Sequence, residues 1–119
     1  MRFLLLIRDG GIVREWSEVR ETEAYGRMMR WADDLRTRGI ILASAPLCPE
    51  SEGARVTARD GKPVTIDGPF AETKDVVGGF TLIDCASKTE AIAIASACPA
   101  TEWGCVEVRE LRVGPALRR

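Results

Sequence analysis

Two stretches of the chain are apolar without interruption, and they organise the rest of its pattern. One covers residues 3–7, and the other is unbroken over residues 40–43 and continues through Ser44 to Ala45. A strand with one wet face would alternate apolar and polar residues, so these unbroken runs predict strands that are buried on both faces. Turn residues follow both runs, with Gly10 and Gly11 after the first and Pro46 directly after the second.

Between these two strands the period of the apolar residues becomes helical. From Thr22 onward, apolar side chains recur every three or four positions and form one stripe, made of Ala24, Met28, Trp31, Ala32 and Leu35. We expect an amphipathic helix that packs this stripe into the core, with Thr22 as its N-cap and Gly39 just beyond its carboxyl end. Residues 12–21 show no clear period, and Trp16 among them either caps the core or lies at an interface.

An Asp-Gly pair at positions 60 and 61 separates two short alternating runs, residues 55–59 and residues 62–66. This arrangement is typical of a β-hairpin with a type I′ turn. We expect one apolar and one polar face on this hairpin. Pro63 indicates that its strand lies at an edge, because proline cannot donate a ladder hydrogen bond.

The carboxyl-terminal part of the chain predicts a strand, a helix and a further strand. Residues 80–84 are expected to form the first strand. Ser87 and Glu90 then match the capping-box spacing that opens a helix, and Pro99 stops that helix. Residues 105–113 are expected to form the last strand.

The predicted order is strand, helix, strand, hairpin, strand, helix, strand, which we interpret as a single α+β domain spanning residues 1–119. Without the hairpin this order is the ferredoxin-like β-α-β-β-α-β pattern. Two helices cover only one face of an antiparallel sheet, whereas the apolar runs predict two buried faces. A second copy of the chain is the simplest cover for the other face, so we expect a homodimer.

Composition narrows the classes of function. The charges nearly balance, with a formal net charge of −1, which argues against direct nucleic-acid binding. The chain has no histidine, and its four cysteines are scattered, so we expect no zinc site and no cofactor. No stretch approaches the roughly 20 apolar residues of a membrane span, and the first apolar run is too short for a signal peptide. We therefore expect a cytoplasmic protein with four free thiols and no membrane partner.

The densest group of special residues follows the hairpin, in the run DGPFAETK at positions 67–74. Gly68 and Pro69 break the strand and set the direction of Asp67. Two roles for Asp67 remain open. Its carboxylate either accepts backbone N–H bonds as a structural cap, which would lower its pKa, or faces an apolar cavity as a functional acid or base, which would raise it.

This run, together with the VGGF at positions 77–80 and the VEVR at positions 106–109, closely resembles the DGPF-type proteins of the YCII-related family. The resemblance covers nearly the whole chain and implies a dimeric α+β barrel, in which two ferredoxin-like sheets pack face to face. Most members of the family are uncharacterised, and some are linked with extracytoplasmic-function sigma factors. Relatives that look enzymatic carry a His-Asp pair at a pocket. Since this chain has no histidine, the resemblance carries over only Asp67.

Two hypotheses of function follow. In the first, a small molecule is bound or converted in a pocket beside residues 67–70, with Asp67 as candidate acid or base and four ligand-contact candidates: Phe70, Glu72, Lys74 and Ser44. In the second, the chain is a non-catalytic accessory domain that binds a protein partner, for example in sigma-factor transcription regulation. A deep pocket favours the first hypothesis, and a flat exposed apolar patch away from the dimer face favours the second.

Overall fold

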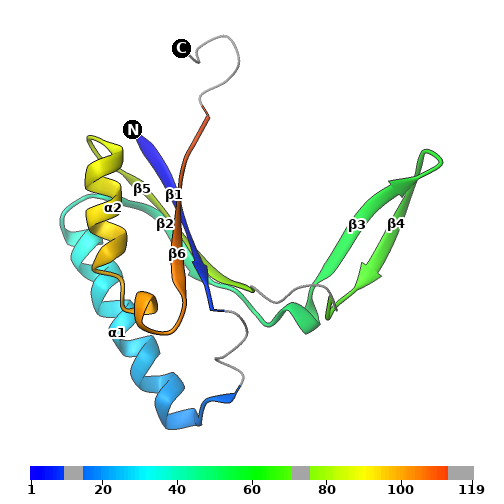
Figure 1. Ribbon diagram of the computed structural model, residues 1–119, viewed down its shortest axis with the longest axis horizontal. Coiled ribbons are helices and arrows are strands. Elements are labelled where there is room, and N and C mark those ends of the chain that lie inside the picture. The colour runs from blue at the N-terminus through cyan, green and yellow to red at the C-terminus, as the bar shows by residue number, and fades with distance from the viewer. Residues whose placement is uncertain (10–14, 71–75, 113–119) are drawn as a thin grey trace.

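A computed structural model of the chain describes residues 1–9, 15–70 and 76–112. Its main sheet has four antiparallel strands in the order β2-β5-β1-β6. Their bounds are β1, Arg2–Arg8; β2, Ile41–Pro46; β5, Val77–Asp84; and β6, Cys105–Glu110. Two helices, α1 (Glu18–Thr37) and α2 (Lys88–Ser96), lie on one face of this sheet (Figure 1). The prediction of a ferredoxin-like α+β fold is confirmed.

Three short elements complete the described chain. A two-stranded antiparallel hairpin consists of β3 (Ala54–Arg59) and β4 (Lys62–Asp67). Two 3-10 helices connect the larger elements, η2 (Glu50–Glu52) before the hairpin and η3 (Pro99–Glu102) after α2. No helix in the described ranges is long and apolar enough to cross a membrane.

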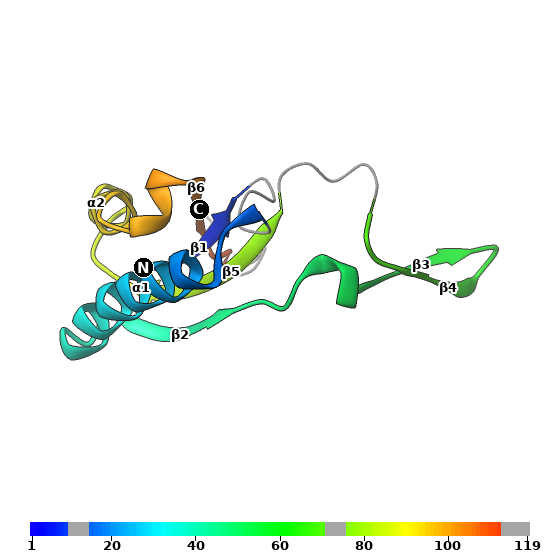
Figure 2. The same cartoon turned by 90° about the horizontal axis from the view of Figure 1, so that it is seen from below.

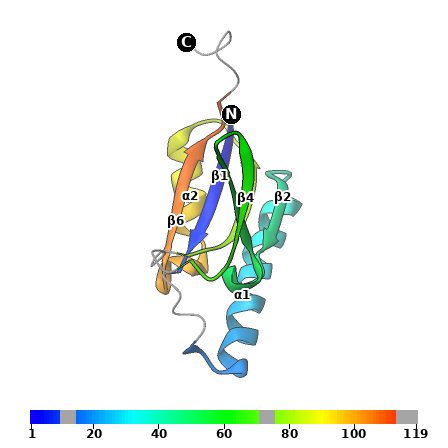
Figure 3. The same ribbon diagram turned by 90° about the vertical axis from the view of Figure 1, so that its right-hand side faces the viewer.

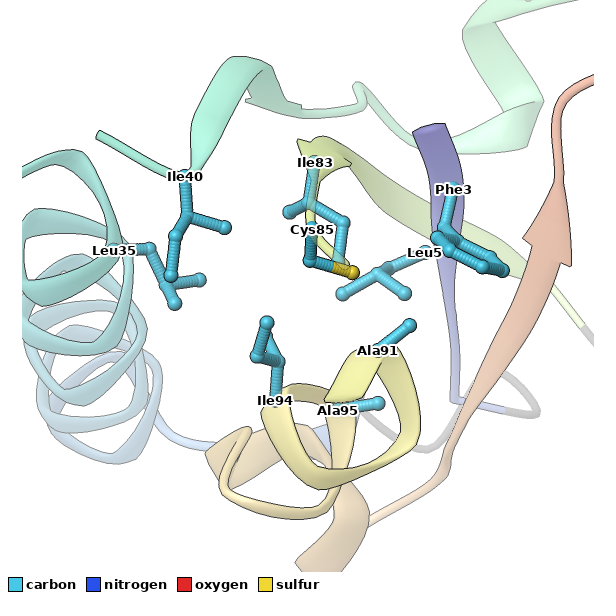
Figure 4. Close-up of a cluster of buried hydrophobic side chains, with 9 residues drawn as sticks. All are labelled: Phe3, Leu5, Leu35, Ile40, Ile83, Cys85, Ala91, Ile94 and Ala95. Carbon is cyan, nitrogen blue, oxygen red and sulfur yellow. The ribbon is translucent and has the colours of Figure 1, made fainter. Parts of the chain in front are cut away.

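The core lies between the helices and the inner face of the sheet. Central strands β1 and β5 contribute alternate residues, and Phe3, Leu5 and Ile83 have no exposed surface. The helices contribute Leu35 from α1 and small residues from α2, and Figure 4 shows these side chains pointing toward one another. The core cluster consists of Phe3, Leu5, Leu35, Ile40, Ile83, Cys85, Ala91, Ile94 and Ala95. The small alanines let α2 lie close to the sheet.

The other face of the sheet is apolar but lacks a covering layer of helices. The strand register sets Leu4 opposite Leu82 and Leu6 opposite Phe80, and all four side chains are only half-buried. Successive side chains of a strand point to opposite faces, so these four lie on the face that the helices leave free. We call the surface formed by Leu4, Leu6, Phe80 and Leu82 the open face. Within the described chain, the predicted burial of both faces holds for the helix side alone.

Helix α1 begins five residues earlier than the sequence pattern predicts. Ser17, not Thr22, is the N-cap, and its side chain accepts a hydrogen bond from the backbone N–H of Arg20 at 3.1 Å. Thr22 lies inside the helix, where its hydroxyl donates to the Glu18 carbonyl. The first turn is exposed and acidic, which suits the positive end of the helix dipole but gives no apolar period to detect. At the other end, Gly39 has the expected positive φ, 71°.

The hairpin has the predicted turn but not the predicted faces. Both turn residues, Asp60 and Gly61, have positive φ, as a type I′ turn requires. The register sets Val56 opposite Thr65, whereas Val64 and Ile66 lie on the other face, opposite Thr57 and Arg55. The prediction of one apolar and one polar face is therefore wrong, because the two strands place their apolar residues on opposite sides.

The hairpin extends away from the sheet on the side opposite the helices (Figures 2 and 3). We call residues 54–67 the arm. Of its twelve strand positions only Val64 is partly buried. At the base of the arm, the backbone N–H of Gly68 donates to the carbonyl of Gly53 at 2.9 Å. A Cβ atom on Gly68 would lie 2.0 Å from the Glu50 carbonyl oxygen, so only glycine fits there.

The first testable prediction concerns the core. Ile83→Ala should lower the free energy of unfolding by about 2–5 kcal/mol, since it removes a fully buried side chain and leaves a cavity. Ile92→Ala is the matched control, because Ile92 is 47% exposed on α2 and its truncation should cost less than about 1 kcal/mol. Urea denaturation at one fixed protein concentration measures both. Equal losses in the two variants would contradict this description of the core.

Candidate functional site

A cavity of about 590 Å³ lies between the first half of α1 and the sheet. Helix α1 contributes one wall, and the facing wall comes from the end of β2 and the start of β5. Aromatic and methionine residues are prominent in the lining, namely Trp16, Tyr25, Met28, Met29, Trp31 and Trp103. A pocket of this size and lining suits a small organic molecule rather than an ion.

A pair of hydroxyl groups marks the sheet wall of the cavity. Ser44 on β2 is opposite Thr81 on β5, and their hydroxyl oxygens are 2.9 Å apart. The Ser44 hydroxyl also donates to the Phe80 carbonyl at 3.2 Å. Thr81 is only 2% exposed, so its hydroxyl depends on Ser44 for a partner. The pair gives an otherwise apolar wall one polar contact point.

Trp16 provides a second polar group at the cavity. Its indole Nε1 is buried and has no hydrogen-bond partner within residues 1–9, 15–70 and 76–112. The ring is fixed by its neighbours, since it meets Trp103 edge-on with centroids 5.2 Å apart and carries the Arg20 guanidinium 4.2 Å from its centroid. Buried donors are usually paired, so this N–H, which has no partner in the described part of the chain, is a candidate donor for a ligand acceptor that reaches it.

Trp103 is fixed in turn by a contact between α1 and η3. Arg27 on α1 donates to both carboxylate oxygens of Glu102, and its guanidinium lies 6.0 Å from the Trp103 ring centroid. The hydrogen bonds from Arg27 hold the pKa of the Glu102 carboxyl below its usual range. Both side chains are well exposed, so the pair positions η3 more than it stabilises the fold.

Three carboxylate side chains, those of Asp9, Glu21 and Glu50, also line the cavity. They are the nearest candidates for proton transfer, because the chain has no histidine. No group of three metal-ligating side chains occurs among the residues that the structure describes. The arrangement therefore offers an apolar binding volume with two hydrogen-bonding points and carboxylates at its border.

The structure separates the predicted site residues. Ser44 lines the cavity, whereas Asp67 and Phe70 are not among its lining residues. Asp67 is exposed at the base of the arm, and Phe70 stacks under the Arg55 guanidinium at 3.9 Å. Glu72 and Lys74 lie outside the described residues. The acid–base role of Asp67 stays a prediction, as does its role as a cap, and its carboxylate accepts no hydrogen bond from the described part of the chain.

Sequence reasoning missed most of this cavity. Met28 and Trp31 were assigned to the core stripe of α1, although both also line the cavity. Trp16 lies in a stretch without a period, and Trp103 follows η3 far along the chain. The only sequence feature that pointed to Trp16 and Trp103 was that both are tryptophans outside the predicted core. That Trp16 could cap the core or lie at an interface was the nearest interpretation.

Fold and cavity together define a ferredoxin-like α+β protein with a small-molecule-sized pocket. The model of the YCII-related domain matches residues 1–113, and the chain belongs to this family, as its sequence resemblance predicts. It is 35% identical over 116 residues to the uncharacterized protein R00369 of Rhizobium meliloti (strain 1021), covering 91% of this chain and 89% of that one.

A solved structure has a similar fold. It is 5-chloro-2-hydroxyhydroquinone dehydrochlorinase (TftG) from Burkholderia phenoliruptrix AC1100, in complex with 2,5-dihydroxybenzoquinone. The TM-score is 0.54 with 19% sequence identity, and the match covers 98% of each chain. At this identity the likeness establishes a shared fold.

The second testable prediction concerns the thiols, all four of which are free in the structure. Cys48 and Cys105 are exposed, whereas Cys85 and Cys98 are buried. Burial raises the pKa of the Cys98 thiol to about 11, so almost no reactive thiolate forms there at pH 8. Ellman's reagent should therefore titrate two thiols rapidly in the native protein and all four in denaturant. Rapid native reaction of four thiols would contradict the buried positions, and a missing pair in denaturant would reveal a disulfide.

Proposed function

We propose that the chain is a homodimeric protein that binds a small, largely apolar ring compound in the cavity between α1 and the sheet and converts it there. The observation that carries the proposal is the indole N–H of Trp16, a residue of the cavity lining, which is buried and has no hydrogen-bond partner among the described residues. Leaving such a donor without a partner costs free energy, which a ligand with an acceptor oxygen would recover.

The shape of the ligand follows from the lining. Flat aromatic side chains favour a flat partner, because offset-stacked and edge-on ring contacts add to the burial of apolar surface. The Ser44–Thr81 hydroxyl pair offers a second polar contact on the sheet wall. A ring with oxygen substituents would use both contact points, and the volume of about 590 Å³ accommodates one such molecule.

Conversion of the ligand would rely on carboxylates. Asp9, Glu21 and Glu50 border the cavity, and any of them could exchange a proton with a bound hydroxyl group. The structural neighbour acts as a dehydrochlorinase and holds a dihydroxybenzoquinone, which is a flat ring with oxygen substituents. Our proposal takes from it the class of ligand, and the carboxylates of this chain supply the acid–base groups.

The proposal of a dimer rests on the open face, whose apolar side chains a second copy would bury. If association covered about 400 Å² of apolar surface on this face, burial would contribute about 10 kcal/mol before the costs of association. The neighbouring edge strand β6 presents Glu107 and Arg109, which the register sets beside Leu6 and Leu4. Within the protomer Glu107 pairs with Arg109 and with Arg8, each at 3.3 Å, and at a two-fold interface Glu107 of each copy could exchange its Arg109 partner with the other.

The third testable prediction concerns the ligand. Trp16→Phe keeps an aromatic wall but removes the N–H, and should weaken binding of 2,5-dihydroxybenzoquinone about 2- to 10-fold without lowering stability. Trp31→Phe is the matched control, because its indole N–H already donates to the Ile94 carbonyl at 3.2 Å. That variant should lose about 1 kcal/mol of unfolding free energy. Isothermal titration calorimetry and urea denaturation measure the two effects.

Equal affinity of the probe for Trp16→Phe and the unchanged protein would show that the N–H does not contact it. If the unchanged protein bound no probe even at millimolar concentration, a different ring compound or the accessory-domain hypothesis would have to replace the proposal.

The fourth testable prediction concerns the dimer. Light scattering on a size-exclusion column should give twice the chain mass at micromolar concentration. Leu82→Lys places a charge in the centre of the open face and should give a folded monomer. Ile92→Lys, on the exposed side of α2, should remain a dimer. A monomeric unchanged protein, or a dimeric Leu82→Lys variant, would exclude the open face as the interface.

A further inference from the structure

The arm leaves more of its surface exposed than a hairpin in a finished fold would. Val56 is 68% exposed and Ile66 is 49% exposed, and these two residues lie on opposite faces of the arm. An isolated two-stranded hairpin is only marginally stable in water. A partner outside the protomer would cover these two residues and stabilise the hairpin.

The position of the arm relates it to the proposed dimer. It extends from the end of β2 on the side of the open face (Figures 2 and 3). A second copy that docked on the open face would therefore stand on the same side of the sheet as the arm. Because of this placement, the second copy can contact the arm, and no other protein is needed as its partner.

Charge identifies where on the second copy the arm would bind. At the tip, Arg59 and Lys62 are directly opposite each other, and neither has an ion-pair partner within the described ranges. At the start of α1, Glu18 and Glu21 are one turn apart and likewise have no ion-pair partner there. Glu21 lines the cavity, and the exposed Tyr25 lies one further turn along the same helix. The basic tip and the acidic helix end are complementary in charge.

We propose that the arm of one protomer crosses to the other and docks its basic tip on the amino-terminal turns of the partner's α1, covering the mouth of the partner's cavity. This inference rests on the proposed homodimer. Each binding site would then be completed by a segment of the other chain. The arm's apolar residues would shield ligand-lining side chains that the isolated protomer leaves exposed, such as Tyr25 and Met29.

Charge reversal tests this exchange directly in the full chain. The tip variant carries Arg59→Glu and Lys62→Glu, and the helix variant carries Glu18→Lys and Glu21→Lys. In a homodimer of either variant, both contacts between tip and helix are repulsive. In a mixed dimer of the two, both contacts are complementary again. A control variant, Arg30→Glu with Lys88→Glu, reverses two exposed helix cations away from the arm.

We expect each reversed variant alone to dimerise at least tenfold more weakly than the unchanged protein, and the control to match the unchanged protein. Mixing the tip variant with the ¹⁵N-labelled helix variant should restore a dimer that native mass spectrometry identifies as containing one copy of each. Affinity for 2,5-dihydroxybenzoquinone should fall several-fold in each variant and return in the mixture. Circular dichroism melts confirm that each variant is folded.

Three results would overturn the inference. If the tip variant dimerised as tightly as the unchanged protein, the tip would not contribute to association. If mixing gave only a statistical share of mixed dimers, the tip and α1 would not be partners. Either result would contradict the arm exchange but not the open-face dimer. A monomeric unchanged protein would contradict both the dimer and the arm exchange.

Discussion

The antiparallel pairing of β1 with β5 at the centre of the sheet is the constraint on which the rest of the structure depends. Its register runs from Arg2 opposite Asp84 to Ile7 opposite Gly79. A slip of one residue would move every apolar side chain of either strand to the opposite face. The observed register sets Phe3 opposite Ile83 under the helices and leaves Leu4 opposite Leu82 on the open face. One pairing thus defines both the core and the candidate interface.

The same pairing explains why the cavity lies where it does. Strands β2 and β5 continue past the helix-covered core, and there Ser44 meets Thr81 below the first half of α1. Helix α2 is short and covers the core region, so the amino-terminal half of α1 is neighboured by the short η3 rather than by α2 (Figure 1). Tryptophan side chains at the start of α1 and after η3 line this region instead. The space between the helices and the sheet is therefore filled by the core at one end and contains the cavity at the other.

The sequence alone predicts features that rest on local chemistry. The Asp60-Gly61 turn, the Ser87 cap and the apolar runs each depend on neighbouring residues, and each occurs in the structure. The α1 boundary was misplaced because its first turn is polar, so a period of apolar residues cannot reveal it. The prediction for the two faces of the hairpin was wrong because the faces depend on the register between its two strands. The residue pattern of either strand alone does not determine that register.

The candidate site was harder to predict for a related reason. Only Ser44, among the predicted residues that the structure describes, lines the cavity. Trp16 and Trp103 come together across most of the length of the chain, and no spacing motif announces such a contact. The DGPF run correctly indicated the family, but it follows the arm rather than the cavity wall.

The base of the arm has a mechanical consequence. Its two ends are tied by the Gly68–Gly53 hydrogen bond, and the Glu50 carbonyl presses so closely on Gly68 that no side chain fits between them. A side chain at position 68 would therefore push the base of the arm away from η2. The 3-10 helix η2 begins at Glu50, which itself borders the cavity. Glu50 thus belongs both to the border of the cavity and to the contact that shapes the base of the arm.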